Sequence, residues 1–485
     1  MAKIVIVGGG VAGLSAGIYA RLGGLEAVVC ESHAVAGGNL TGWDRGGYHI
    51  DNCIHWLTGT NPSCYLYKMW EELGVLGGVR IYQGNSLFTC ERDGKAVSLV
   101  PSLSGLRQQM LAVAPEDEKE INSLIRAIDL IMGATNTAGE RGNEGLTLRR
   151  ALTGVSPLLR YYGLTTGQMA ARFKNPTMQC FITGFWGRDF GALALLYVFA
   201  TYCGGNGALP EGGSTAMAER MVDRFLSLGG ELKLNKRAVK VNMQGRRAVS
   251  VSFSDGSTEK ADYVILTTDP AVTFGTLLDS PMPRELEKLY NNKRMKRFSA
   301  YHCAFACDMS DLPFEGDVIF DVPSQYVDEL HTEQVILREF SHEPSFAPEG
   351  KNLLQTLTFC FEEDSKDFIR LRHEDRAAYK AKKEGLASRL KSLIEEHYPQ
   401  LAGRLTIIDT WTPASYRRFV NSDIGSFMSF AMPERYLPVP MDGRVKGFDN
   451  LFLATQWQQS PGGLPIAAEC GKKAVEKIVK MEKKS

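Results

Sequence analysis

The N-terminal residues carry a glycine pattern that only a few folds accommodate. The apolar run KIVIV at residues 3–7 leads into GGGVAG, which satisfies the spacing GxGxxG at Gly8, Gly10 and Gly13. A segment with helical spacing of small and apolar residues follows, and a second apolar run, AVVC, then ends next to Glu31. A strand, a glycine turn, a helix and a second strand in this order predict the first βαβ unit of a parallel sheet.

Each residue of this motif has a mechanical role in binding a dinucleotide. Gly8 permits the tight turn, Gly10 lets the backbone approach a pyrophosphate, and Gly13 allows close contact between helix and strand. Ala12 lies in the first turn of the helix, whose N-terminus would face the anion. Glu31 can accept hydrogen bonds from a ribose diol and would repel a 2′-phosphate, so we expect NAD or FAD rather than NADP.

The composition is that of a soluble globular protein and argues against several other classes. Lys plus Arg and Asp plus Glu both total 55, so the formal net charge is zero and no nucleic-acid partner is expected. The ten cysteines include no CxxC pair, which favours a reducing, cytoplasmic location over a disulfide framework. The longest apolar run, residues 192–202, is about half of the roughly 20 residues that a membrane-spanning helix needs, and the N-terminus lacks a signal-peptide core.

The α/β pattern of the N-terminus recurs twice along the chain. Residues 210–285 combine a helical segment with several strand-like runs, and residues 445–485 read as a strand, a glycine turn and a helix. We therefore predict an α/β fold with one discontinuous Rossmann-type domain built from residues 1–88, 210–285 and 445–485. The intervening residues 89–209 and 286–444 are richer in Phe, Tyr, Met and Pro, and we expect them to form an inserted α+β substrate-binding domain.

The stretch YHIDNCIHWLTG at residues 48–59 places four metal-ligand types on one face of an extended strand: His49, Asp51, Cys53 and His55. Same-face residues of a strand stand about 6.5 to 7 Å apart, whereas the ligands of one zinc ion lie within about 4 Å of one another. A straight strand cannot bring all four together. No metal site is therefore predicted.

The segment that precedes this stretch identifies the cofactor by resemblance. Gly37-Gly38-Asn39 followed by Gly46-Gly47-Tyr48-His49-Ile50-Asp51 resembles the second signature of flavoproteins in the phytoene desaturase and amine oxidase superfamily. The resemblance implies that FAD is bound by the Rossmann-type domain. Two residues depart from the family pattern: Asn39 stands where the family usually has Arg, and Cys53 stands where it usually has Gly.

Further motifs extend the resemblance over nearly the whole chain. Residues 173–176, 209–214, 412–416 and 462–465 look like the family's F-x-(D/N)-P, P-x-GG, TPxxY and GG-x-P elements. The glycine pair before Pro465 and the stretch Ile54-His55-Trp56 are most similar to the carotenoid desaturase, carotenoid isomerase and retinol saturase branch. Beyond the first motif, the resemblance implies FAD contacts from Gly38, Asn39, Ile54, Val239, Thr455, Gly463, Leu464 and Pro465.

The resemblance implies an FAD-dependent oxidoreductase that desaturates or saturates carbon–carbon bonds of a lipophilic polyene or isoprenoid-like substrate. The alternatives are a non-redox isomerase that requires reduced FAD, a flavin amine oxidase and, ranked last, a lipid-binding escort similar to GDP-dissociation inhibitors. Saturation needs a proton donor as well as a hydride, and His55 is the candidate. Residues 181–202 are apolar enough to form either a substrate tunnel or a buried core helix.

The expected redox partner is a diffusing electron acceptor or donor, such as oxygen or a quinone. Only one intact dinucleotide fingerprint is present, so a separate nicotinamide domain is not supported. Relatives of this kind often take lipophilic substrates from membranes, which adds a peripheral contact with the inner face of a membrane to the expectations.

Overall fold

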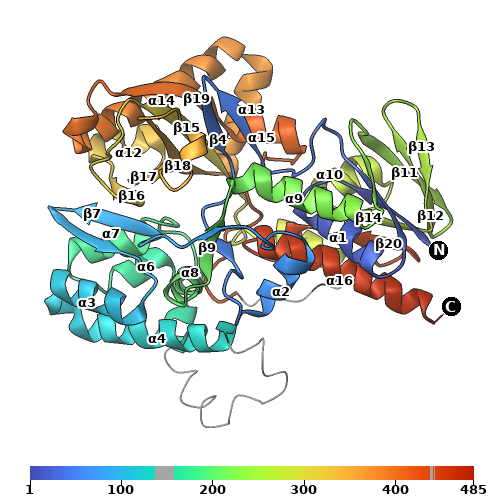
Figure 1. The fold of residues 1–485 in the computed structure, drawn as a ribbon, viewed down its shortest axis with the longest axis horizontal. Coiled ribbons are helices and arrows are strands. Elements are labelled where there is room, and N and C mark those ends of the chain that lie inside the picture. Colours follow the sequence, from blue (N-terminus) through green and yellow to red (C-terminus); the bar gives the residue numbers. More distant parts are fainter. Residues whose placement is uncertain (137–157, 437–440, 442, 485) are drawn as a thin grey trace, which may run out of the picture.

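A computed structural model describes residues 1–136, 158–436, 441 and 443–484. A five-stranded parallel sheet with strand order β10-β2-β1-β14-β20 forms one half of the molecule (Figure 1). Its strands are β1 (Lys3–Val7), β2 (Glu26–Cys30), β10 (Glu231–Lys233), β14 (Tyr263–Leu266) and β20 (Leu451–Leu453). Segments that are far apart in the sequence therefore meet in one sheet, which confirms the predicted Rossmann-type α/β fold.

Side-chain alternation divides this sheet into two apolar faces. On one face, Ile4 and Ile6 pack against the helices α1 (Val11–Leu22), α9 (Gly213–Ser227) and α16 (Leu464–Glu482). On the other face, Val5 and Val7 pack against a three-stranded antiparallel sheet formed by β11 (Ala238–Gln244), β12 (Arg247–Phe253) and β13 (Thr258–Lys260). The strands read as continuous apolar runs because both of their faces are covered.

A seven-stranded sheet with strand order β19-β15-β18-β17-β16-β7-β8 forms the other half of the molecule (Figure 1). Its strand pairs are antiparallel except for β16 and β7. The strands are β7 (Phe88–Arg92), β8 (Lys95–Ser98), β15 (Phe298–Cys307), β16 (Asp317–Asp321), β17 (Gln334–Glu339), β18 (Asn352–Phe361) and β19 (Leu405–Trp411). All of them come from the two stretches predicted to be inserted, except that β7 begins one residue earlier, at Phe88, while the domain boundaries themselves stay a prediction.

Helices cover both faces of the seven-stranded sheet. The helices α13 (Glu362–Glu374) and α14 (Arg376–His397) pack on one face, where Leu390, Leu393 and Ile394 are buried. Asp375 is the N-cap of α14, and its side chain accepts a hydrogen bond from Ala378 N. The other face meets α3 (Leu103–Val113), α4 (Glu118–Asn136), α6 (Thr166–Ala170), α7 (Pro176–Thr183) and α8 (Ala192–Cys203).

The remaining elements are short. They are β3 (Gly42–Arg45), β4 (Tyr48–Asp51), β5 (Leu57–Thr58), β6 (Ile81–Tyr82), β9 (Gly207–Pro210), α2 (Tyr65–Glu72), α10 (Pro270–Val272), α11 (Arg284–Tyr290), α12 (Ser324–Leu330) and α15 (Pro413–Val420). Within the described part of the chain, none of the helices is both long enough and apolar enough to cross a lipid bilayer.

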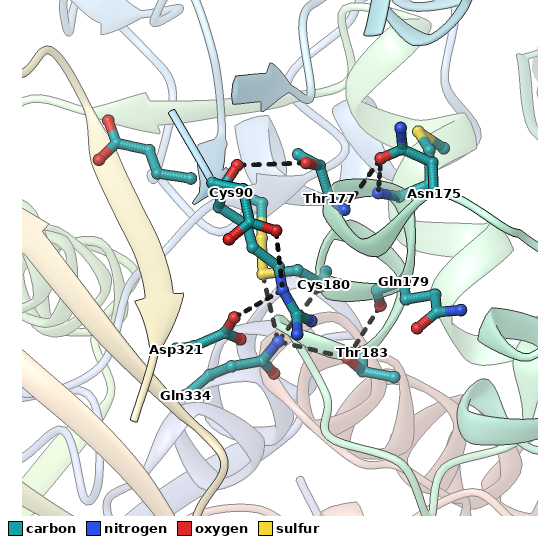
Figure 2. The surroundings of a disulfide bond; sticks show 12 residues. Cys90, Asn175, Thr177, Gln179, Cys180, Thr183, Asp321 and Gln334 are labelled. Carbon is teal, nitrogen blue, oxygen red and sulfur yellow. Dashed lines mark hydrogen bonds and ion pairs between the residues drawn. A yellow bond between two sulfur atoms is a disulfide. The ribbon is translucent and has the colours of Figure 1, made fainter. Parts of the chain in front are cut away.

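One disulfide bond corrects the expectation drawn from the cysteines. Cys90 of β7 is bonded to Cys180 of α7, and the other eight cysteines are free (Figure 2). The side-chain amide of Gln334 donates to Cys180 Sγ at 3.2 Å and to Thr183 Oγ1 at 3.3 Å. The bond ties α7 to β7, the strand next to the edge strand β8 of the seven-stranded sheet. The expectation of cysteines without a disulfide is therefore wrong for this pair.

Replacement of Cys90 and Cys180 by serine should lower the free energy of unfolding by about 3 kcal/mol, because the bond closes a loop of 90 residues in the unfolded chain. Thermal unfolding of the wild type with and without dithiothreitol checks this. The double variant is the matched control and should show no further effect of the reductant. A wild-type melting temperature that does not change on reduction would contradict the assignment.

Gly13 should not tolerate alanine. A Cβ atom at this position would lie 1.9 Å from the carbonyl oxygen of Gly8, so the helix α1 would have to move away from the strand β1. We expect Gly13→Ala to destabilise the protein by about 3 kcal/mol. Gly385→Ala on α14 is the control, because its Cβ would meet nothing within 4 Å, and it should stabilise the helix by about 0.5 to 1 kcal/mol. Chemical denaturation measures both values, and equal effects would refute the close contact.

Candidate functional site

A cavity of about 760 Å³ lies between the parallel sheet and the seven-stranded sheet. The first βα turn, at the carboxyl end of β1, forms one end of it, as expected for ligand binding in a doubly wound fold. Twelve of the residues singled out from the sequence line this cavity: Gly8, Gly10, Ala12, Glu31, Gly38, Asn39, Ile54, His55, Thr455, Gly463, Leu464 and Pro465.

The glycine turn forms the polar end of the cavity. Gly8 has φ +106°, a conformation that residues with a Cβ rarely adopt, and Gly10 is the N-cap of α1. Glu31 is buried, and its carboxylate accepts hydrogen bonds from Gly9 N at 2.8 Å and from His33 N at 2.9 Å. Glu31 therefore stabilises the turn by these hydrogen bonds while it also lines the cavity. The N-terminus of α1 offers unpaired N–H groups to an anion.

Two of the predicted residues lie outside the cavity wall. Gly13 is one turn into α1, where its close approach to Gly8 is the contact expected of it. Val239 was expected to offer its backbone to the adenine, but its side chain is 45% exposed and it does not line the cavity. Lys236, Arg237 and Ala238 form the wall there instead. The backbone contact expected of Val239 therefore stays a prediction.

Asn39 replaces the charged contact expected of its family position with a structural one. Its side-chain amide donates to Ser426 O at 3.2 Å and to Phe427 O at 3.1 Å. The amide thus fixes the segment that forms the opposite wall. Asn39 Oδ1 is buried with no hydrogen-bond partner among the described residues, so an acceptor remains at the cavity.

The four metal-ligand types of residues 48–59 have separate structural roles. Asp51 ends β4, and its carboxylate accepts from Cys53 N at 3.0 Å and from both Ser214 N and Ser214 Oγ at 2.6 Å. His49 instead contacts Asp44 at 2.8 Å, away from this corner. Cys53 lines the cavity, and burial raises the pKa of its thiol to about 12, so the sulfur is protonated at neutral pH.

His55 is the ionisable group best placed to meet a substrate. It lines the cavity, and its Nε2 atom is buried with no hydrogen-bond partner in the described part of the chain. Burial, then the positive charge of Arg338, hold the pKa of His55 well below its usual range. The imidazole is therefore neutral at pH 7, with one nitrogen that donates and one that accepts.

A buried ion pair beside His55 was not foreseen from the sequence. Arg338 of β17 donates to the carbonyl oxygen of Ile54 at 2.8 Å and to Asp317 Oδ2 at 3.3 Å. Burial raises the pKa of Asp317 to about 6, although Arg338 acts to lower it. Both residues could have been noticed in the sequence. Arg338 is a charged residue within the apolar run QVILREF, and Asp317 is a charged residue next to the apolar residues of GDVIF.

A second buried polar group lies on the neighbouring strands. Tyr416 donates its hydroxyl hydrogen to Asn52 Oδ1 at 2.8 Å and contacts His302 Nε2 at 3.0 Å. His302 stacks on Trp411 with ring centroids 4.6 Å apart, and burial lowers its pKa to about 3. Asn52 directly follows Asp51, so this group helps to fix the same corner. The TPxxY segment thus contributes a structural tyrosine.

The far end of the cavity is apolar. Its walls come from α8, from the loop after α7 and from strands β7, β17 and β18. The apolar lining residues there include Phe88, Phe185, Trp186, Leu193, Val198, Ile336, Leu357 and Phe359. Residues 181–202 therefore contribute both to the core and to the cavity wall, since α8 packs in the core with one face and lines the cavity with another.

The C-terminal motif lies where its resemblance predicted. Thr455 is buried at the cavity wall, and α16 begins at Leu464 with Gly463 as its N-cap. Pro465 occupies the first turn, where a missing N–H costs nothing. The positive end of a second helix thus reaches the cavity, and it can stabilise negative charge on a bound ring.

The residues fit a flavin dinucleotide. The α1 N-terminus and Glu31 suit a pyrophosphate and a ribose, and the α16 N-terminus suits an electron-accepting ring. Unpaired buried polar atoms of Asn39, His55, Trp186 and Ser426 also occur among the lining residues, and a ligand with polar edges would satisfy them. FAD is the cofactor that meets these conditions.

Comparison with known proteins agrees with this geometry. The family model described as flavin containing amine oxidoreductase matches residues 11–479. The chain is 22% identical to prolycopene isomerase of Arabidopsis thaliana, over 92% of this chain and 78% of the relative. It is 23% identical to phytoene desaturase (lycopene-forming) of Pseudescherichia vulneris, over 88% and 89%.

A solved oxidoreductase from Methanosarcina mazei shares the fold, with a TM-score of 0.62 at 16% identity over 99% of this chain and 100% of that one. The resemblance to the carotenoid desaturase branch is confirmed by the relatives. The chain belongs to the flavin containing amine oxidoreductase family and is a flavin-dependent oxidoreductase whose cofactor is FAD.

Proposed function

We propose that this protein removes or adds hydrogen across a carbon–carbon bond of a lipophilic polyene or isoprenoid substrate. The observation that carries the proposal is that one continuous cavity is lined by the glycine turn at one end and by apolar residues at the other. His55 lines the same cavity. The two relatives named above are called an isomerase and a desaturase of carotenoids. An apolar, aromatic wall is the surface that a polyene chain needs in order to leave water.

Some of the lining residues would bind the cofactor, and others would position the substrate. Gly8, Gly10, Glu31 and the α1 N-terminus would hold the pyrophosphate and ribose, and the α16 N-terminus would hold the ring. When bound, the flavin supplies the hydride chemistry. The apolar walls would orient the substrate and exclude water, and His55 would hold or deliver a proton at its Nε2 atom.

The second candidate is an isomerase that requires reduced FAD but leaves the substrate at its original oxidation state. The 22% identity to a prolycopene isomerase favours this candidate. Anaerobic incubation of the reduced protein with a polyene-containing lipid extract distinguishes the two. A mass change of two hydrogens supports the redox reaction, and an isomer of unchanged mass supports isomerisation. Oxidation of an amine instead would refute both.

The electron partner proposed for the flavin is a diffusing acceptor or donor, such as oxygen or a quinone. The single GxGxxG motif supports this, because a nicotinamide nucleotide would need a second binding unit. Stoichiometric NAD(P)H added to the purified protein should not bleach the flavin rapidly. Rapid bleaching without another protein would refute the proposal.

His55→Phe should bind FAD normally and lose about 100-fold in kcat, the typical contribution of a positioned proton donor. The ring volume is kept, while the Nε2 atom at the cavity is removed. Flavin absorbance gives the FAD content, and turnover is scored by mass as above. His373→Phe, on the exposed part of α13, is the control and should match the wild type. Unchanged turnover in His55→Phe with intact flavin would eliminate the role.

The rim of the cavity is proposed to meet a lipid surface. Tyr65 and Tyr197 line the cavity, yet they are 48% and 40% exposed. The two residues are close to each other, because Tyr197 contributes to the raised pKa of Tyr65. Leu159, 63% exposed, follows the lining residue Leu158. Aromatic residues at a cavity mouth suit the boundary between lipid and water, where their rings are partly buried.

The double variant Tyr65→Glu/Tyr197→Glu should co-sediment at least about 5-fold less with vesicles of phosphatidylcholine and phosphatidylglycerol, because two charges would enter the interface. Its FAD content should be unchanged. The matched control is Leu22→Glu/Leu226→Glu, at residues that are each 46% exposed and do not line the cavity. Wild-type protein that stays in the supernatant at every lipid composition would remove the proposal.

A further inference from the structure

A second, much smaller cavity of about 40 Å³ lies behind His55. It shares only His55 and Asp317 with the walls of the large cavity. Its other walls come from β6, β9, β17, the end of α8 and residues 84–87. The exposed residues Asn85 and Glu315 also line it. The small cavity thus extends from a buried histidine of the large cavity to residues at the molecular surface.

The small cavity has the size and polarity to hold water. One water molecule needs about 10 to 15 Å³ of such volume and two to four polar partners, so about three molecules would fit. The polar groups along its walls are Tyr82, Asn85, Ser86, Tyr202, Glu315, Asp317, Arg338, Glu339 and His342. A chain of water molecules within this lining would have hydrogen-bond partners along its whole length.

Asp317 stands at the junction of the two cavities with an unusual set of neighbours. Its carboxylate accepts from Arg338 Nε at 3.3 Å and from Glu339 N at 3.3 Å. Glu315 and Glu339 add negative charge to the same lining, and His342, whose pKa is lowered to about 4 by burial, is neutral. Burial raises the pKa of Asp317 to about 6, so this carboxyl gains and loses a proton close to neutral pH.

His55 is suited to pass a proton between the two cavities. It is neutral, because burial and the charge of Arg338 disfavour the imidazolium, and its Nε2 atom has no partner among the described residues. A neutral imidazole can take a proton on one nitrogen and release another from the second nitrogen, which returns it to its starting charge. Among the described residues, Asp317 is the one other group that lines both cavities.

We propose that the small cavity is a water-filled proton path that connects His55 to solvent, with Asp317 at the junction of the two cavities. This inference rests on the proposed function. In a desaturation the substrate would lose a hydride to the flavin and a proton to His55, and that proton would pass through Asp317 and water to solvent. In a saturation a proton from solvent would travel inward along the same path to the second carbon, and reduced FAD would supply the hydride.

The first experiment needs no substrate. In the FAD-loaded protein with ¹⁵N-labelled histidine, the His55 ring signals, identified by their loss in His55→Phe, should shift between pH 5 and 8 with a midpoint of about 6, the value of the Asp317 carboxyl. Asp317→Asn should abolish this shift. Asp321→Asn, at the other end of the same strand and outside both cavities, should keep it. Signals that stay flat in the wild type, or that shift equally in Asp317→Asn, would overturn the proposal.

The second experiment measures turnover. Ser86→Met would place a larger side chain in the wall of the small cavity, and it should lower kcat at least about 10-fold with KM unchanged. In the wild type, kcat should rise as the pH passes upward through about 6 if the substrate loses hydrogen, because ionised Asp317 then accepts the proton. It should fall over the same range if the substrate gains hydrogen. Asp317→Asn should flatten the profile, whereas Asp321→Asn should not.

Failure of this path and failure of the proposed function give different results. If the wild type turns over a polyene and Ser86→Met and Asp317→Asn match it at every pH, the path is refuted and the function stands. If no polyene is converted by any variant, the function is refuted, and the histidine signals alone decide whether Asp317 and His55 are coupled.

Discussion

The carboxylate of Asp51 fixes the corner on which the site depends. It accepts hydrogen bonds from the backbone of Cys53 and Ile54 and from both the backbone and the hydroxyl of Ser214. The first pair shapes the turn that carries His55, and the second holds the N-terminus of α9, where negative charge is favoured. Gly213 has to lack a side chain, because a Cβ there would lie 2.3 Å from the Asp51 carboxylate. One side chain thus joins the turn to the nucleotide-binding half of the molecule.

Arg338 holds the same turn from the other half. A buried guanidinium costs several kcal/mol unless its donors find partners, and here they do. It donates to the Ile54 carbonyl and to Asp317, and it lies 4.8 Å from the ring centroid of Phe340. Asp51 therefore binds backbone N–H groups of the turn, and Arg338 binds a backbone carbonyl of the same turn. Its geometry depends on the two halves staying in contact.

Local patterns predicted local structure well. The strand, glycine turn and helix at the N-terminus, the start of α16 near Gly463 and the end of β4 at Asp51 all follow from short-range chemistry, since a tight turn needs glycine wherever it occurs. The strand that carries Val239 has a feature that the sequence does not display: the register of β11 shifts between Ala238 and Lys240.

The features that were not predicted from the sequence are pairs of residues that lie far apart along the chain. Asp317 and Arg338 are 21 positions apart and meet because Val318 pairs with Leu337 across β16 and β17. Cys90 and Cys180 are separated by 90 residues and meet only when α7 docks on β7. Such pairs depend on the register and packing of the whole inserted sheet. A single charge in an apolar run shows that a partner exists, but it does not show which residue the partner is.

The polar corner has to be compatible with the apolar wall beside it. A carboxylate in place of His55 would add a second acidic group to a cavity wall that already includes Asp317, and burial would disfavour its charged form. A lysine would meet Arg338 with the same result. Imidazole avoids both costs because Arg338 and burial together keep it neutral. It still offers a donor and an acceptor, so the corner keeps hydrogen-bonding capacity without adding net charge beside the apolar residues that would enclose a polyene chain.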